Sequence, residues 1–191
     1  MTRHVHDPTL LRAIAHPVRN RILGELSAQG PLRAADLSQE LGIPANQASF
    51  HLRQLAKYGL VEEAVGEGRD RRDRVWRLVD ESGLDLDLGE LEKQPGGPAA
   101  AAVFRAHSGA WAHTLVDAAY AGSKPPGIHR SITDQTLRLS VAEARELATE
   151  LNAVLQQWAD RTRGRDPERR TYSFLSIIQP LPEATHDQRR S

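Results

Sequence analysis

Two short helical patterns, separated by only a few residues, constrain the fold of this chain more than any other feature. The first, "AADLSQELG", has two leucines four residues apart and ends near Gly42, a residue suited to a helix C-terminus. The second, "IPANQASFHLRQLAKYGLVE" at residues 43–62, carries a narrow apolar stripe of Ala48, Leu52 and Leu55. A stripe this narrow is typical of a helix that lies on a small core.

Two more helical patterns precede this pair. The first begins at Asp7 and Pro8, a capping residue followed by a proline at the first helical position. Pro17 breaks or restarts that helix, and apolar residues continue at helical spacing until Gly30 and Pro31. The apolar positions are Leu10, Leu11, Ile14, Val18, Ile22, Leu23 and Leu26.

The residue pattern changes after Gly59. The segments "LVEEAV" and "RVWRLV" are rich in β-branched and aromatic residues, which favour strands. Between them, "GEGRDRRD" supplies the glycines of a hairpin loop. The predicted order is therefore helix, helix, tight turn, helix and hairpin.

The polar side of the helix within residues 43–62 suits a DNA surface. Amide and guanidinium groups form paired hydrogen bonds to adenine and guanine, a serine bonds phosphate or base, and a phenylalanine contacts a thymine methyl. The residues off the apolar stripe are Asn46, Gln47, Ser49, Phe50 and Arg53, with Lys57 one turn later in a position suited to phosphate. The alternative is an ordinary solvated helix face.

The hairpin loop concentrates arginines. Arg69, Arg71, Arg72 and Arg74 are offset only by two aspartates, and arginines at a hairpin tip reach the DNA backbone or a narrow minor groove. Solvated arginines are the alternative. A basic hairpin that follows such a helix pair favours DNA binding more than either feature alone.

Three segments, "LRAIAHPVRNRIL", "LSQELGIPANQASFHLRQLAKYGLVE" and "GRDRRDRVWRLV", resemble the ArsR family of bacterial winged-helix transcriptional repressors. The resemblance covers about residues 8–80. Its specific parts are the "AHPVRNRIL" start, the "LG" turn, the "SFHL" and "GLV" motifs and the arginine-rich wing. Five such motifs in order make the resemblance much stronger than any one of them.

The resemblance implies a repressor that binds a palindromic operator as a homodimer, with two copies of the reading helix about one helical turn apart. It also implies that the polar residues from Asn46 to Arg53 read operator DNA and that the wing arginines hold the flanking backbone. His51 borders the apolar stripe, so it is either a packing residue or a further DNA contact. Pro44 replaces the hydroxyl residue usual at the start of this helix, which leaves the helix start geometry open.

The C-terminal part has a different pattern. An acidic connector with glycine and proline at residues 81–97 suggests a hinge, and residues 98–121 predict a long helix suited to dimerisation. Short strands are expected at 135–139, "QTLRL", and within 171–182, "TYSFLSIIQPLP". Between them, Ser140 and Glu143 form a capping-box pattern ahead of an amphipathic helix.

The predicted fold is mainly α with a small β component. A winged helix-turn-helix domain at residues 1–80 precedes the connector at 81–97 and a C-terminal α/β extension at 98–191. That extension is expected to dimerise, with ligand binding as a second possibility.

Composition excludes several classes of protein. The chain has 191 residues and no cysteine, so disulfides, thiolate metal sites and cysteine nucleophiles are excluded. The 25 Lys and Arg residues balance 25 Asp and Glu residues, so the distribution of charge must carry any affinity for DNA. Neither a membrane span nor a secretory signal is recognisable, which predicts a cytoplasmic protein.

The effector stays open. His113 and Asp117 share one side of the long helix, and His107 lies on another, but such a pair is more often a surface feature than a metal site. His4 and His6 add little, and no cofactor or metal is predicted. Four aromatic residues either enclose a small apolar ligand or extend a dimer core: Trp111, Trp158, Tyr172 and Phe174.

Two other classes of function compete with DNA binding. A catalytic C-terminal domain would need a recognisable site, and the chain has no phosphate-binding glycine loop, G-x-S-x-G elbow or H-E-x-x-H motif. We therefore predict that the protein is not an enzyme. A winged helix used only for protein contacts is the other alternative, which the basic hairpin disfavours.

Overall fold

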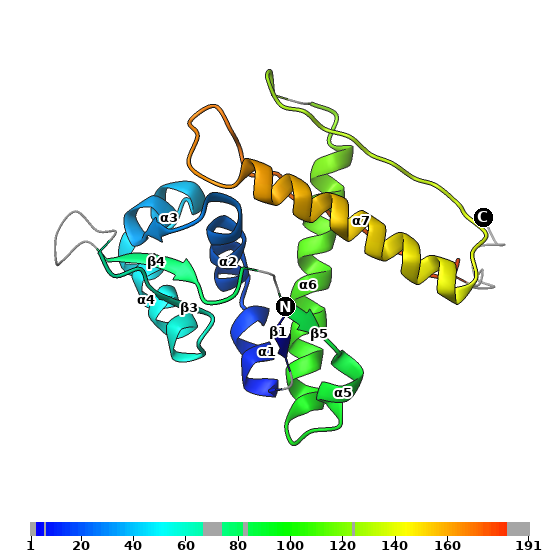
Figure 1. Ribbon diagram of the computed structural model, residues 1–191, viewed down its shortest axis with the longest axis horizontal. Coiled ribbons are helices and arrows are strands. Elements are labelled where there is room, and N and C mark those ends of the chain that lie inside the picture. The colour runs from blue at the N-terminus through cyan, green and yellow to red at the C-terminus, as the bar shows by residue number, and fades with distance from the viewer. Residues whose placement is uncertain (1–2, 6, 67–73, 82–83, 124, 183–191) are drawn as a thin grey trace.

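The computed structural model describes residues 3–5, 7–66, 74–81, 84–123 and 125–182. The helices α1 (Pro8–Ala15) and α2 (Pro17–Gln29) follow one another with only His16 between them (Figure 1). Asp7 caps α1, because its carboxylate accepts a hydrogen bond from the Thr9 amide at 2.8 Å. Arg19 satisfies the other end of α1, where its guanidinium donates to the Arg12 and Ala13 carbonyl oxygens.

The predicted helix pair is confirmed as α3 (Ala34–Leu41) and α4 (Ala45–Lys57). Gly42 adopts a φ of 65° in the turn, a conformation that favours glycine. The Ser38 hydroxyl, donating to the Ile43 carbonyl oxygen at 2.6 Å, holds the turn from the other side. The stripe of Ala48, Leu52 and Leu55 is fully buried, as its spacing predicted.

The predicted hairpin is confirmed in its strands. The strand β3 (Val61–Glu63) pairs antiparallel with β4 (Val75–Leu78), and β4 also pairs antiparallel with the short strand β2 (Leu32–Arg33). The sheet order is β2-β4-β3, with Val61 and Trp76 buried beneath it. A helix-turn-helix followed by this hairpin is a winged helix-turn-helix fold, as predicted.

The acidic connector contains structure that sequence patterns did not predict. Here β1 (Arg3–Val5) pairs parallel with β5 (Leu84–Leu86), and α5 (Leu88–Glu92) follows. Leu91 of α5 is fully buried in the core. Gly97 packs so closely on α5 that a Cβ there would lie 1.9 Å from the Leu91 carbonyl oxygen. The connector glycine therefore serves a close helix contact.

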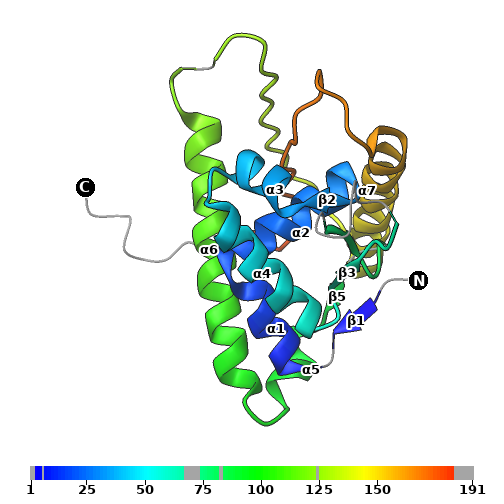
Figure 2. The ribbon, with the colours of Figure 1, turned by 90° about the vertical axis from the view of Figure 1, so that its left-hand side faces the viewer.

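The predicted long helix is confirmed as α6 (Gly97–Tyr120). The first turns of α6 pack on α1 and bury Ala100 and Ala101 completely. Figure 2 shows this contact at the lower half of α6. The rest of α6 runs beyond this contact, where Val116 and Tyr120 are exposed. One helix thus combines a core segment with a long exposed segment.

The amphipathic helix is also confirmed, as α7 (Val141–Thr162), and Ser140 and Glu143 form its capping box. None of its residues is buried. In Figure 1, α7 crosses in front of α6, whereas Figure 2 shows that the two helices lie apart.

The strands predicted at 135–139 and within 171–182 are wrong. The described residues there have no regular secondary structure, and their apolar side chains, such as Leu137 and Ile177, are exposed. A strand needs a neighbouring strand for its backbone hydrogen bonds, whereas β-rich composition supplies only a side-chain preference. These segments have no such neighbour within this chain's described residues.

The segment that follows α7 returns to the winged-helix unit, and we name residues 163–171 the C-terminal strap (Figure 1). Its contacts are an ion pair of Arg163 with Glu81, an ion pair of Arg165 with Asp36, a hydrogen bond from the Gly164 amide to the Ala28 carbonyl oxygen at 3.4 Å, and one from the Thr171 hydroxyl to Glu25 at 2.8 Å. The strap therefore ties the C-terminal part to α2, α3 and the chain just after β4.

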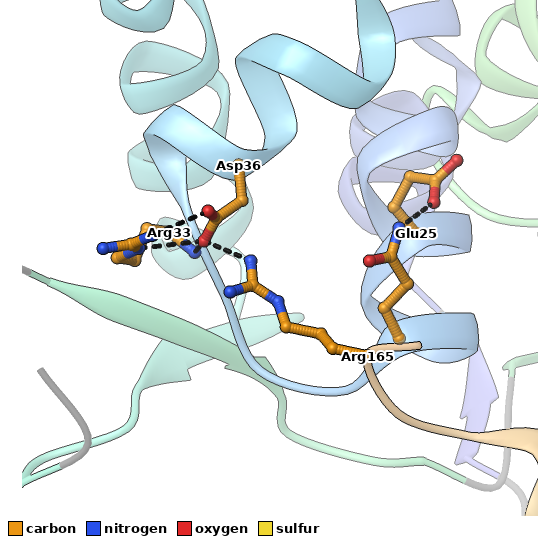
Figure 3. Close-up of polar contacts among 5 residues, drawn as sticks. Glu25, Arg33, Asp36 and Arg165 are labelled. Atoms are coloured by element: carbon orange, nitrogen blue, oxygen red, sulfur yellow. Dashed lines mark hydrogen bonds and ion pairs between the residues drawn. The ribbon is translucent and has the colours of Figure 1, made fainter. Parts of the chain in front are cut away.

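Asp36 is the centre of this contact (Figure 3). Its carboxylate accepts hydrogen bonds from the Arg33 backbone amide and guanidinium at 2.9 to 3.0 Å, and it also pairs with Arg165. Partial burial alone would raise the pKa of Asp36, but the bonds from Arg33 and Arg165 outweigh it and lower the pKa from 3.8 to about 2. Asp36 is thus ionised throughout the neutral range.

We expect Asp36→Ala to lower the free energy of unfolding by about 1 to 2 kcal/mol at pH 7, because it removes the α3 capping acceptor. The folded-state pKa lies below the unfolded one, so this contribution is present above pH 3.8 and is lost as pH falls toward 2. Denaturant unfolding at pH 7, 4 and 3 measures it. A difference from wild type that stays constant over this range would contradict the assignment, and Asp166→Asn within the strap is the control.

Candidate nucleic-acid interface

The outward side of α4 is set by the side that is buried. Ala48, Leu52 and Leu55 contact the core, so residues on the opposite side of the same helix face solvent. The helix begins at Ala45 without a side-chain cap, and the Pro44 carbonyl oxygen accepts from the Ala48 amide at 3.0 Å. Pro44 therefore starts α4 through its backbone, which resolves how the helix begins without a hydroxyl residue.

Four of the predicted contact residues form one exposed row along α4: Asn46, Phe50, Arg53 and Lys57. Their spacings of four, three and four residues place them on a single side of a helix. The Phe50 side chain is 49% exposed, which is unusual for a large apolar residue and leaves its ring available to a partner. We name this row the α4 face.

Gln47 and Ser49 lie at the edges of the α4 face and are half-buried. The backbone N–H of Gln47 donates to the Asn46 side-chain oxygen at 2.9 Å, which holds the Asn46 side chain over the first turn of α4. The first half of the helix thus presents amide and hydroxyl groups, and the second half presents two cations.

His51 lies beneath the α4 face, not on it. It is 5% exposed, its ring centroid is 4.6 Å from that of His16, and the Phe50 ring meets it edge-on at 5.3 Å. The packing alternative considered for His51 matches this position. Its role as a direct DNA contact stays a prediction that its burial does not favour.

The hairpin follows α4 closely in the sequence, since β3 begins four residues after the end of the helix. Arg74 is exposed and pairs with Glu63 at 3.0 Å, and Arg77 pairs with Glu62 at 2.7 Å across β3 and β4. The other predicted wing contacts, Arg69, Arg71 and Arg72, lie outside the described residues. The described base of the wing is therefore a set of balanced ion pairs.

Sequence patterns did not identify the groups behind α4. His16 contacts His51 ring to ring at a tilt of 47°, and burial together with the nearby Arg19 lowers the pKa of both rings. His16 and Arg19 belong to the "AHPVRNRIL" motif, but the contact of His16 with α4 joins segments far apart in the chain, which local sequence patterns do not predict.

The candidate effector residues are dispersed over the surface. His107, His113 and Asp117 are exposed on α6, and no group of three or more His, Asp or Glu side chains suited to a metal occurs among the described residues. Each of the four aromatic side chains considered for a ligand is more than a third exposed: Trp111, Trp158, Tyr172 and Phe174. These four do not enclose a ligand site within the described part of a single chain.

None of the helices described here has the length and apolarity required to cross a bilayer.

Comparison with protein families matches residues 14–64 to a helix-turn-helix domain. That segment runs from the end of α1, through the α3–α4 turn, to the residue after β3. The match therefore includes the whole α4 face.

Several solved structures are similar at low identity. They include a mutant of ZitR from Lactococcus lactis (14% identity, 75% of each chain, TM-score 0.32), a mutant of MarR from E. coli (16%, 77% of this chain and 86% of that one, 0.34) and a mutant of MepR from S. aureus bound to an oligodeoxyribonucleotide (18%, 74% and 78%, 0.29). Comparison with curated proteins gives no match.

TM-scores this low do not support an assignment of fold or function. The assignment of fold rests on the elements of the chain and on the helix-turn-helix match. The helix pair, its glycine turn and the antiparallel hairpin all follow the predicted order. The chain is a winged helix-turn-helix protein, and residues 14–64 contain its helix-turn-helix domain.

Proposed function

We propose that this protein is a sequence-specific DNA-binding transcriptional regulator, a repressor of the ArsR type, that binds a palindromic operator as a homodimer. The observation that carries the proposal is the α4 face: one exposed row of amide, aromatic and cationic side chains on the second helix of a helix-turn-helix domain. The second helix of this motif is the one that enters the major groove.

The chemistry of the α4 face divides along the helix. Asn46 and Gln47 at its start match adenine, and Arg53 matches the two acceptors of guanine. Phe50 offers an apolar surface to a thymine methyl, Ser49 bonds either a base or a phosphate, and Lys57 suits a phosphate. Direct readout thus comes from the residues between Asn46 and Arg53, and positioning comes from Lys57 at the end of α4.

The wing supplies backbone contacts in this proposal. Arg74 must exchange its Glu63 partner for a phosphate, which limits its net contribution, because the ion pair is lost when the phosphate contact forms. The other loop arginines, Arg69, Arg71 and Arg72, are proposed to contact the flanking backbone on the basis of their sequence position. Wing contacts to phosphate strengthen binding to all sequences alike.

The apolar surface of the C-terminal part supports the homodimer. Along α7, five large apolar side chains are at least 36% exposed: Val141, Leu151, Val154, Leu155 and Trp158. A helix gains most of its stability in a protein from packing its apolar side, yet α7 buries no residue within its own chain. We propose that a second copy covers this surface and the exposed end of α6, which places two α4 faces on one operator.

Selection of bound fragments from the source genome with purified protein tests the function. We expect enrichment of an inverted repeat whose half-sites lie about one helical turn apart, because a two-fold dimer imposes its symmetry on the site. If no fragment is enriched over non-specific DNA, the proposal is refuted in favour of a protein-contact or catalytic role. Enrichment of a single half-site would retain sequence-specific binding and refute the dimer.

Arg53→Ala should weaken binding to the selected operator by about 1 to 3 kcal/mol and relax the base preference at one position of each half-site, because it removes a paired bond to guanine. Equilibrium titration against the operator and single-base variants measures both effects. An equal loss on operator and scrambled DNA would instead make Arg53 a phosphate contact. Arg145→Ala, an exposed arginine on α7, is the matched control and should leave binding unchanged.

Glu63→Gln should raise affinity for operator and scrambled duplexes alike by about two- to fivefold, because it releases Arg74 from an exposed ion pair worth at most about 1 kcal/mol. Titration at two salt concentrations should also show a steeper salt dependence than wild type. Unchanged affinity would show that Arg74 lies away from DNA. Glu150→Gln on α7 makes the same change of charge away from the wing.

A further inference from the structure

A pair of histidines lies beneath the α4 face. His16 joins α1 to α2, and His51 lies in the middle of α4, with ring centroids 4.6 Å apart and ring planes inclined at 47°. The Nδ1 atom of each ring is buried and has no hydrogen-bond partner among the described residues. The pair therefore forms a direct contact between the reading helix and the junction of the first two helices.

Among the described residues, the side chains that shift the pKa values of this pair carry positive or no charge. Arg19 of α2 acts on both rings, and its guanidinium is held in place by the Arg12 and Ala13 carbonyl oxygens. From α6, His107 acts on His16. On the side of α4, the Phe50 ring covers His51, and Tyr58 interacts with Arg19. A proton added to either ring would therefore face cations.

The surroundings keep both rings neutral near pH 7. Burial lowers the pKa of His16, and Arg19 and His107 lower it further, which together outweigh the raising effect of a hydrogen bond to its own backbone. Burial likewise lowers the pKa of His51, with His16 and Arg19 adding to the effect. Both imidazoles are thus uncharged when the helices are packed as observed.

Protonation would conflict with the observed packing in two ways. A neutral imidazole leaves one ring nitrogen as an acceptor, whereas an imidazolium has an N–H at both. At His51 an N–H on the buried Nδ1 would have no acceptor among the described residues, which carries a desolvation cost. The new charge would also face Arg19 and the neighbouring ring. Both costs are relieved if the rings separate, which moves α4 away from the α1–α2 junction.

We propose that the His16–His51 pair is an acid-sensitive contact that regulates DNA binding: the neutral pair holds α4 in its reading position, and protonation releases it. This regulation rests on the proposed function, because it acts on the α4 face. His16 is a positioning residue in this scheme and does not contact DNA.

The direction in which DNA affinity changes with pH distinguishes protonation of the His16–His51 pair from protonation of exposed histidines. Both folded-state pKa values lie below the ordinary value of 6.5, so the packing contribution is complete above pH 6.5 and is lost as pH falls below it. Exposed histidines act in the opposite direction, because each proton they gain adds a charge that attracts phosphate. Weaker binding in acid is therefore the signature of the buried pair.

The test compares operator affinity at pH 7.5, 6.5 and 5.5 at one salt concentration. For the wild type we expect operator affinity to fall by about tenfold between pH 7.5 and 5.5. Packing the pair in its neutral form requires one histidine to lose its proton, and this lowers affinity by at most about tenfold for each pH unit below 6.5. His16→Gln should retain most binding at pH 7.5 and lose much less at pH 5.5. His113→Gln, which removes an exposed histidine of α6, should behave as wild type.

A second measurement needs only the wild type and covers the case in which His16→Gln does not fold. Nuclear magnetic resonance titration of the imidazole carbon-bound protons should give two rings with midpoints below 6.5, and denaturant unfolding should show stability falling as pH drops from 6.5. Titration midpoints at about 6.5 for both His16 and His51 would overturn the inference.

The outcomes keep this inference separate from the proposed function. Failure to bind any operator selectively at pH 7.5 contradicts the proposed function. Selective binding at pH 7.5 that is unchanged or stronger at pH 5.5 leaves the function in place and overturns the acid-sensitive contact. An equal acid-dependent loss in wild type and His16→Gln would assign the effect to other groups and would also overturn it.

Discussion

The burial of one narrow stripe on α4 determines which side chains of that helix face solvent and which face the core. Ala48, Leu52 and Leu55 are completely removed from solvent, and each buried leucine contributes on the order of 1.5 to 3 kcal/mol. Because successive residues of a helix are related by a fixed rotation about its axis, burial of one side fixes the direction in which every other side chain on α4 leaves the backbone. The α4 face points outward and His51 points into the packed side for the same reason.

Local signals identified the helices and the exposed residues of the candidate site. Capping residues, prolines and apolar spacing are properties of a few neighbouring residues, and α1 to α4, α6 and α7 all follow them. Features that require distant partners were missed or mispredicted. The strand β5 depends on β1 at the other end of the unit, and "QTLRL" has no regular secondary structure. The His16–His51 and Arg165–Asp36 contacts were missed because neither is encoded in adjacent residues.

The two halves of the chain differ in how they are stabilised. The described N-terminal half has a contiguous apolar core that also includes Leu91, Ala100 and Ala101 from beyond residue 80. Beyond the first turns of α6, the C-terminal half has large apolar side chains on its surface and contacts the first half through the polar contacts of the strap. A unit with this distribution gains little from its own chain and much from a partner, which is the physical basis of the proposed dimer.

The position of the strap near the end of the sequence affects the order in which contacts form during synthesis and folding. Thr171 and Glu25, which it joins, are 146 residues apart in the sequence, whereas the packing of α3 on α4 joins near neighbours. Contacts between distant residues close late, because a long loop must lose its freedom first, and synthesis delivers the N-terminal residues first. We therefore expect the helix pair to form before the strap is available to hold α7 to it, so that a newly made chain carries its α4 face before its C-terminal half is docked.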